Sequence, residues 1–204
     1  MTQPISIKAN ELEAISLASG ADETRYYLKG VCFEPYKDGT TGMIATDGHR
    51  LHSLYAKRLE DAPKASFILG SDDIKKALSM YKAEAKTMGK HAAQYLTIEI
   101  TDKTISIIYK KEDDIKTCAS FSYTPIDGNF PDWRRVVPGK PDKEFAPFMS
   151  FSTKYFADFG TAAKLLTPQK NPQVKIEASG AEQPIIVTLP YNSDFLGVLM
   201  PMRA

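Results

Sequence analysis

One pattern occurs three times along the chain, and it limits the fold more than any other feature of the sequence. Each copy begins with a short strand-like run, continues into an amphipathic helix and ends with three strand-like runs. The copies begin at ISIKA (5–9), SFILG (66–70) and FMSFS (148–152). A unit of about 65 residues with one helix covers its own sheet poorly, so such units must pair within or between subunits. The pattern therefore predicts an α+β fold of three repeated β-α-β-β-β modules, with helices on antiparallel sheets.

Polar residues mark where the three helices are expected to begin. Asn10 is expected to cap the first helix, with Glu13 three residues later as in a capping box. Ser71 and Ser152 are expected to cap the second and third helices. Apolar residues at helical spacing then predict the faces that point to the core: Leu12, Ile15 and Ala18; Ile74, Leu78 and Tyr81; and Tyr155, Phe156, Phe159 and Ala163.

Apolar runs, several of them alternating, predict three strands after each helix. The runs are YYLKGVCFE (26–34), GMIAT (42–46) and RLHSLYA (50–56); then YLTIEIT (95–101), TISIIYK (104–110) and TCASFSY (117–123); then VKIEAS (174–179), PIIVTLP (184–190) and FLGVLMPM (195–202). A tight turn is expected at Asp102-Lys103. The segment PGKPDKEFAP (138–147) is rich in proline and charge, so it is the best candidate for a domain boundary.

The composition is that of an ordinary soluble globular protein. Of 204 residues, 43% are hydrophobic and 25% are charged. No apolar run reaches the roughly 18 residues of a membrane span, and the first residues do not resemble a signal peptide. Cys32 and Cys118 lie inside strand-like runs, which favours buried, reduced thiols and a cytoplasmic location. The net charge is +1, so any affinity for nucleic acid must come from local clusters of charge.

The second predicted helix carries the clearest cluster of positive charge. Asp72 and Asp73 lie in its first turn, where the helix dipole favours anions. Five lysines follow: Lys75, Lys76, Lys82, Lys86 and Lys90. They form a stripe suited to phosphates, although a solvated helix face is the alternative. No aromatic residues alternate with the lysines, so contact with nucleic acid would involve the backbone and carry no sequence preference.

The sequence contains no arrangement typical of an enzyme or a metal site. Asp47, His49 and His52 are close in sequence, but on a strand the first two share one face and His52 takes the other. No CxxC pair, glycine-rich phosphate loop or GxSxG elbow occurs. We therefore expect no catalytic residue, metal or cofactor. The DGH stretch is better explained as a turn, in which Gly48 supplies backbone freedom and Thr46 or Asp47 bonds the local backbone.

Four separated segments resemble one known family, in that family's order. RYYLKGVCFE (25–34), ATDGHRL (45–51), DGNFPDWRRVVP (127–138) and VLMPMR (198–203) resemble the β sliding clamp of bacterial DNA polymerase III. Residues 1–140 are similar to the clamp's middle domain, and residues 146–204 to the second half of its last domain. The resemblance implies a DNA clamp fold of about one and a half clamp domains. The family's first domain and the first half of its last domain have no counterpart here.

The resemblance also implies a function. A clamp is a processivity factor for DNA replication: its ring encloses duplex DNA and holds DNA polymerase and other partners by short clamp-binding peptides. A clamp loader is a further candidate partner. Since the family's ring contains twelve modules, counting predicts a homo-tetramer for a chain with three. By the resemblance, the peptide pocket comprises Leu28, Thr46, Gly48, His49, Arg50, Leu51, Pro131, Arg135, Val136, Val198, Met200, Pro201, Met202 and Arg203, and the DNA-facing residues are the five lysines.

Three questions stay open at the level of sequence. The residues near the C-terminus can complete a pocket in their own chain, complete one in a neighbouring chain, or complete none. The protein can also be a decoy that binds clamp-binding peptides or a host clamp without enclosing DNA, or a DNA-binding accessory protein that lost the pocket. Two residues depart from the family's pattern: Trp133 stands where tyrosine is common, and Ala204 where a leucine-like residue is usual.

Overall fold

The computed structural model describes residues 4–56, 65–101, 103–112, 114–138, 149–178, 180 and 182–202. Module 1 comprises β1 (Ile5–Ile7), α1 (Ala9–Ser16), β2 (Gly30–Pro35), β3 (Thr41–Thr46) and β4 (Arg50–Ala56). Module 2 comprises β5 (Phe67–Gly70), α2 (Ser71–Met88), α3 (Ala92–Tyr95), β6 (Leu96–Ile100), β7 (Thr104–Lys111) and β8 (Asp114–Ser122). Module 3 comprises α4 (Thr153–Leu166), β9 (Lys175–Ala178), β10 (Ile185–Leu189) and β11 (Asn192–Leu199). The predicted α+β architecture of repeated modules is confirmed.

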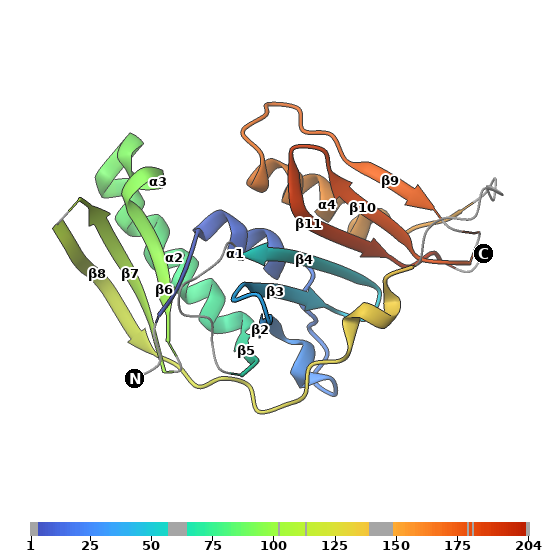
Figure 1. Cartoon of the computed structure of the whole chain (residues 1–204), viewed down its shortest axis with the longest axis horizontal. Helices are drawn as coiled ribbons and strands as arrows, with labels where there is room; N and C mark the ends of the chain where they lie inside the picture. The colour runs from blue at the N-terminus through green and yellow to red at the C-terminus, as the bar shows by residue number, and fades with distance from the viewer. Residues whose placement is uncertain are drawn as a thin grey trace.

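The strands form two antiparallel sheets that join the modules. One sheet has the order β1-β6-β7-β8, and the other has the order β5-β2-β3-β4-β11-β10-β9. Modules 1 and 2 exchange their first strands, because β1 pairs with β6 and β5 pairs with β2. Module 3 joins module 1 through β4 and β11, with a register that runs from Phe195 opposite Leu54 to Leu199 opposite Arg50. Figure 1 shows the four-stranded sheet at one end of the molecule and module 3 at the other.

The seven-stranded sheet has a different apolar layer on each face. Met43, Ala45 and Leu54 belong to the main core, which also takes residues from α1, α2 and α4. Ile44 and Leu51, which alternate with them along the strands, belong to a second cluster together with Trp133 and Val198. Successive side chains of a strand point to opposite faces, so the helices cover one face and a different segment covers the other.

That second segment, residues 123–138, is here named the strap. It leaves β8 and crosses the seven-stranded sheet from β5 towards β4 and β11, as the yellow trace in Figure 1 shows. Ile126 of the strap bridges Ile68 of β5, and a short 3-10 helix, Trp133–Val136, lies near its end. Because Trp133 is buried in the second cluster, the strap is fixed to the sheet at both places.

The predicted helix caps are wrong in detail. Helix α1 begins at Ala9, with Lys8 at its N-cap, and the Lys8 backbone N–H donates to Glu11 Oε2 at 3.4 Å. The Asn10 amide instead donates to the carbonyl oxygen of Leu165 at 2.8 Å, near the end of α4. Asn10 therefore joins two helices rather than capping one, a contact that local sequence does not encode. Ser71 is the first residue of α2 and follows the N-cap Gly70. Only Ser152 occupies its predicted N-cap position, and its side chain makes no cap bond.

Other local predictions also need correction. Tyr26–Leu28 forms a 3-10 turn before β2. The described part of FMSFS, residues 149–152, makes a single bridge and no strand. Phe156 was expected in the core but is 39% exposed, and Cys118 is only half-buried, whereas Cys32 is buried. The linker residues 139–147 and Asp102 of the predicted turn lie outside the described residues. Across the described chain, no helix combines the length and apolar character needed to cross a membrane.

Candidate functional site

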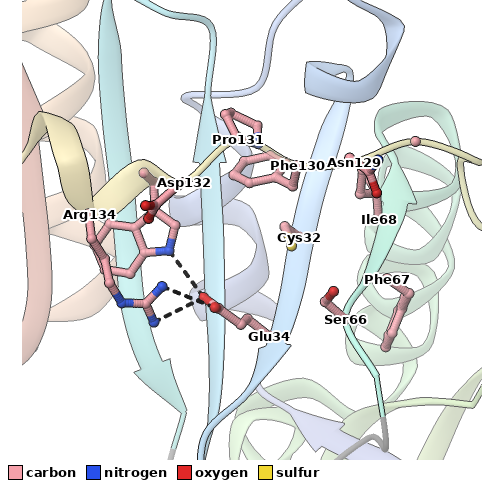
Figure 2. A pocket seen from close by; sticks show the side chains of 12 residues that line it. Cys32, Glu34, Ser66, Phe67, Ile68, Asn129, Phe130, Pro131, Asp132 and Arg134 are labelled. Atoms are coloured by element: carbon pink, nitrogen blue, oxygen red, sulfur yellow. Dashed lines mark hydrogen bonds and ion pairs between the residues drawn. The ribbon is translucent and has the colours of Figure 1, made fainter.

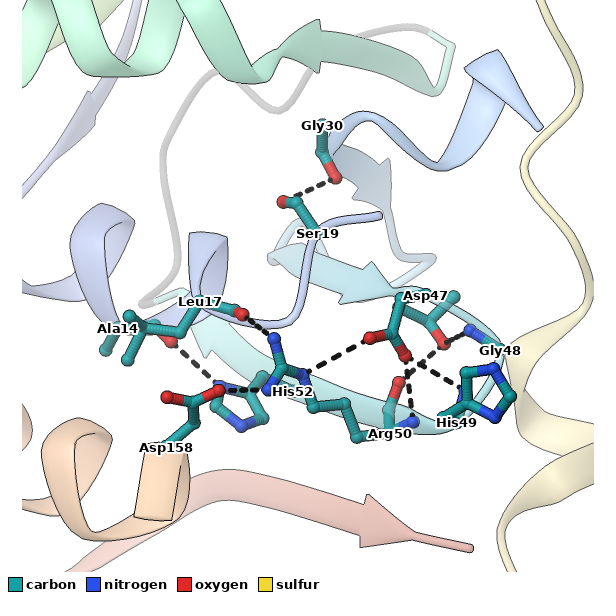
Figure 3. A network of polar contacts seen from close by, with 11 residues as sticks. Ala14, Leu17, Ser19, Gly30, Asp47, Gly48, His49, Arg50, His52 and Asp158 are labelled. Atoms are coloured by element: carbon teal, nitrogen blue, oxygen red, sulfur yellow. Dashed lines mark hydrogen bonds and ion pairs between the residues drawn. The ribbon is translucent and has the colours of Figure 1, made fainter. Parts of the chain in front are cut away.

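The turn between β3 and β4 is built by local hydrogen bonds. The Gly48 N–H donates to Thr46 Oγ1 at 3.1 Å, and the N–H groups of His49 and Arg50 both donate to Asp47 Oδ1, at 2.9 and 3.1 Å. Gly48 has φ +90°, a conformation that favours glycine. The predicted turn is confirmed, and it holds the His49 side chain at the surface. Figure 3 shows this turn and the polar contacts beside it.

Arg50 is a buried arginine that joins three elements. Its guanidinium makes an ion pair with Asp158 of α4 and donates a hydrogen bond to the Leu17 carbonyl oxygen, just after α1. Its Nε lies 3.6 Å from Asp47 Oδ2. The ring of Tyr155 covers its other side, with the Arg50 Cζ atom 4.5 Å from the ring centroid. These contacts, drawn in part in Figure 3, fix α4 against module 1.

His52 points into the core, away from His49. Its Nδ1 lies 2.8 Å from the Ala14 carbonyl oxygen, which can only accept, so Nδ1 carries the proton. The imidazole packs between the rings of Phe159 and Phe195, and burial lowers the pKa of His52 to about 4. His52 is therefore buried on the face opposite to the exposed His49, as the strand pattern predicts. Among the described residues, no group of three or more metal-ligating side chains could hold a metal ion.

Glu34 of β2 binds the strap to the seven-stranded sheet. Its carboxylate accepts a hydrogen bond from Trp133 Nε1 at 3.1 Å and two from the Arg134 guanidinium, at 3.0 and 3.2 Å. The hydrogen bond to Glu34 also raises the pKa of Arg134. Figure 2 shows Arg134 beside Glu34, at the edge of a polar cavity of about 380 Å³ that Cys32 also lines. The bidentate pair fixes the position of the strap over β2 and β3.

A second, mainly apolar cavity of about 200 Å³ opens where the turn, the strap and the end of β11 meet. It brings together ten of the fourteen predicted pocket residues: Leu28, Thr46, Gly48, His49, Arg50, Leu51, Pro131, Val136, Val198 and Met200. All of them come from one chain, because β11 pairs with β4 of the same chain. We name it the apolar cavity. In the structure, Val198 and Met200 of the C-terminal segment thus lie beside the turn and the strap of their own chain.

The other predicted pocket residues lie elsewhere. Arg135 is exposed on the strap, Pro201 is half-buried, and Met202 is 57% exposed and outside the cavity lining. Arg203 lies outside the described residues. The prediction missed two lining residues, Asp132 and Trp133, although both stand between Pro131 and Val136 in the same motif.

Tyr155 is a further residue that the pocket prediction missed. Its ring stacks on His49 at a centroid distance of 5.9 Å, and it lines a polar cavity of about 230 Å³ that shares Leu28, His49 and Arg50 with the apolar cavity. Arg25 and Lys154 also line this neighbouring cavity. The apolar cavity therefore continues into a polar groove of mixed charge, in which Arg25 pairs with Asp22 at 3.2 Å. The helical spacing of α4 assigns Tyr155 to a core face, and nothing in that spacing indicates a contact with His49.

The lysines of α2 are exposed, but several have partners. Lys75 lies 3.2 Å from Asp72, and Lys82 lies 2.8 Å from Glu13 of α1. The Nζ atom of Lys76 stands 4.2 Å from the ring centroid of Phe121. Lys86 is exposed and has no ionic partner within the described part of the chain, whereas the Lys90 side chain lies outside what the structure describes. Lys86 is thus the lysine of α2 that has neither an ion pair nor a ring contact within the described residues.

The sequence of this chain is similar to those of bacterial sliding clamps. Residues 6–132 match the family model described as the DNA polymerase III beta subunit, central domain. The chain is 24% identical to the beta sliding clamp of Caulobacter vibrioides (strain NA1000 / CB15N) over 186 residues, which is 86% of this chain and 44% of that protein. It is 25% identical to the beta sliding clamp of Escherichia coli (strain K12) over 193 residues, 89% of this chain and 47% of that protein. The chain thus spans about half the length of these relatives.

The solved structures agree with the sequence comparison. The DNA polymerase sliding clamp of Caulobacter crescentus superposes with a TM-score of 0.70 at 19% identity, covering 100% of this chain and 66% of that chain. The clamp of Pseudomonas aeruginosa superposes with a TM-score of 0.67 at 19% identity, covering 100% and 66% of the two chains. At such identities the likeness establishes the fold, and it confirms the predicted clamp fold. The chain belongs to the DNA polymerase III beta subunit family and is similar to the bacterial β sliding clamp.

Proposed function

We propose that this protein is a non-enzymatic DNA sliding clamp. In this proposal four chains form a ring that encloses duplex DNA in the cytoplasm, and the ring tethers DNA polymerase and other proteins that carry clamp-binding peptides. The observation that carries the proposal is the apolar cavity, in which the turn at 46–51, the strap and the end of β11 come together in one chain.

The lining of the apolar cavity suits a short peptide with apolar side chains. Leu28, Val198 and Met200 supply apolar walls, and a methionine adapts its shape to different side chains. A volume of about 200 Å³ has room for one or two such side chains. The polar groove that continues past His49 contains Lys154, which would orient a peptide carboxylate or carbonyl, and Arg25, which pairs with Asp22.

The helix side of the molecule supports contact with DNA. The exposed lysines of α2 supply positive charge on one side of the molecule. Contacts from lysine to phosphate are weak individually and carry no sequence information, so they permit sliding. Lys86 is the strongest candidate, since Lys75, Lys76 and Lys82 have partners in their own chain. The two-part division of the chain, with a clamp domain at 1–140 and a half domain at 146–204, belongs to the same proposal.

Peptide binding tests the cavity directly. Fluorescence anisotropy with a labelled clamp-binding peptide from a bacterial polymerase should give saturable binding to the wild-type protein. Met200→Lys places a charge in the apolar cavity and should weaken binding at least tenfold, since desolvating it costs more than about 1.4 kcal/mol. Tyr191→Lys changes an exposed aromatic residue outside the lining and serves as the control. Equal binding by all three proteins would remove the cavity from the proposal.

Retention on DNA separates a clamp from a peptide-binding decoy. A closed ring, once assembled, stays on nicked circular DNA and leaves when the DNA is linearised, whereas a surface binder treats both alike. Light scattering should give a mass of about four times 22.6 kDa that persists on dilution. A protein that binds peptide but remains monomeric and is not retained on circles is a decoy, which contradicts the ring. A protein that binds DNA but no peptide is an accessory DNA-binding protein.

A further inference from the structure

Modules 1 and 2 complete each other by a reciprocal exchange. The first strand of module 1, β1, pairs antiparallel with β6, which is the first strand after the helix of module 2. In return, β5 of module 2 pairs antiparallel with β2, the first strand after the helix of module 1. Helices α1 and α2 pack together between these two exchanges. A complete domain therefore needs two modules, each donating one strand and accepting one.

Module 3 holds a donor segment in the same position as β5. Ile68 of β5 precedes the start of α2 by three residues and bridges Ile126, a few residues beyond the end of β8. Ser150 likewise precedes the start of α4 by three residues and bridges Met202, a few residues beyond the end of β11. The bridging Met202 N–H donates to the Ser150 carbonyl oxygen at 2.7 Å. On its other side β5 pairs with β2, but within the described residues no strand pairs with the other side of 149–152.

Module 3 also holds an open acceptor edge. Strand β9 corresponds to β2 and β6 in the repeat, and it pairs with β10 on one side. On its other side no strand of the described chain follows, so β9 ends the seven-stranded sheet, as Figure 1 shows. Ile176 of β9 is 45% exposed although it sits between Lys175 and Glu177 in the middle of the strand. An exposed apolar residue on an unpaired edge favours addition of another strand.

The outer face of α4 is also exposed in the part of the chain that the structure describes. Phe156, Ala157 and Gly160 are exposed on it, and a Cβ atom at Gly160 would meet nothing within 4 Å. The ring of Phe156 lies 6.4 Å from that of Phe151, so the exposed face continues into the donor segment. Helix α1, by contrast, packs against both α2 and α4. Among the described residues, the donor segment, the acceptor edge and the helix face of module 3 are thus all open.

We propose that module 3 forms a complete domain with module 3 of a second copy of this chain. Under a two-fold axis, residues 149–152 of each protomer add to β9 of the other, and the two α4 helices pack through Phe156 and Gly160. A second copy is the fitting occupant, because each module 3 has one donor and one acceptor and two copies satisfy both. The inference rests on the proposed ring, of which it names one subunit contact.

Cysteine cross-linking tests the contact between the helices. Gly160→Cys is placed in a Cys118→Ser background, where the remaining Cys32 is buried. Oxidation, or a short bismaleimide, should join the protomers into a covalent dimer. Adding Phe156→Asp, or Ile176→Lys on β9, should reduce the cross-linked fraction at least tenfold, while Tyr191→Asp should leave it unchanged. Absence of a cross-link in the parent protein, or equal cross-linking in all variants, would overturn the contact.

Two further readouts distinguish failure of this contact from failure of the clamp function. Phe156→Asp should still bind the peptide, because the residue does not line the apolar cavity, but it should have a lower molar mass and no retention on circular DNA. If Phe156→Asp keeps its mass and its retention, the contact is wrong and the ring stands. If the cysteine variant cross-links but the wild-type protein is not retained on circles, the contact stands and the clamp function is wrong.

Discussion

The guanidinium of Arg50, at the start of β4, pairs with the carboxylate of Asp158 in α4, 108 residues further along the chain. The same guanidinium donates to the Leu17 carbonyl oxygen next to α1. Arg50 also lines the apolar cavity. One side chain therefore joins modules 1 and 3 and shapes the proposed peptide site, so the position of module 3 and the shape of the cavity are coupled.

Replacing Arg50 should cost a large part of the protein's stability. Arg50→Met removes the buried cation and leaves Asp158 and the Leu17 carbonyl without their partner. Breaking a mostly buried pair in this way costs about 3 kcal/mol. Urea unfolding should show this loss in the free energy of unfolding. Lys8→Met removes a solvent-exposed ion pair with Glu11 and should change it by less than about 0.5 kcal/mol. Equal effects of the two substitutions would contradict the role given to Arg50.

Glu34 should influence peptide binding without touching the peptide. Glu34→Gln weakens the bidentate bond to Arg134, so the strap that carries Pro131 and Trp133 is held less firmly. Because this pair is partly exposed, we expect about 1 kcal/mol, a roughly fivefold loss of peptide affinity. Glu99→Gln breaks the ion pair with Lys110 on the other sheet, which has similar exposure, and should leave the affinity unchanged. Anisotropy titrations measure both affinities, and an unchanged affinity in Glu34→Gln would contradict the anchoring of the strap by Glu34.

Acid should destabilise the fold through His52. Burial lowers the folded-state pKa of this group to about 4 from 6.5, so the unfolded chain takes up the proton first as the pH falls. The stabilising contribution is therefore complete above pH 6.5 and is lost as the pH falls towards 4, by about 3 kcal/mol in total. Urea unfolding across this range measures the slope. His52→Asn, which keeps a donor near the Ala14 carbonyl, should have a flatter profile, and parallel profiles would contradict the assignment.

The lysines of α2 should set the salt dependence of DNA retention. Lys82→Glu/Lys86→Glu reverses two exposed charges, so retention on circular DNA should fall, and the slope against log salt should decrease by about one for each phosphate that the variant no longer neutralises. Lys170→Glu changes an exposed lysine in the loop after α4 and is the control. Peptide affinity should stay the same in both. An unaltered salt slope in the double variant would place the DNA-binding surface elsewhere.

Local patterns predicted much of this fold, and long-range contacts account for the rest. Helical and alternating spacing of apolar residues predicts the helices and strands, because such elements form from residues that are close in sequence. The motif at 45–51 likewise predicts the turn. The destination of the Asn10 amide, the partners of Arg50 and the stacking of Tyr155 on His49 depend on residues far away in the sequence. Phe156 has the spacing of a core residue, but no described residue covers the helix face to which it belongs. Most of the cavity residues were identified through the family's motifs rather than from spacing.

The pairing of β4 with β11 has a consequence for valency. Since one chain supplies every segment of the apolar cavity, the number of cavities in an assembly equals the number of its chains. A ring of four would offer four docking places. A two-fold axis between adjacent chains of a closed ring lies in the plane of the ring, so it turns one chain over relative to the next. Two docking places would then face each way along the DNA, and partners could occupy both sides of the ring at once.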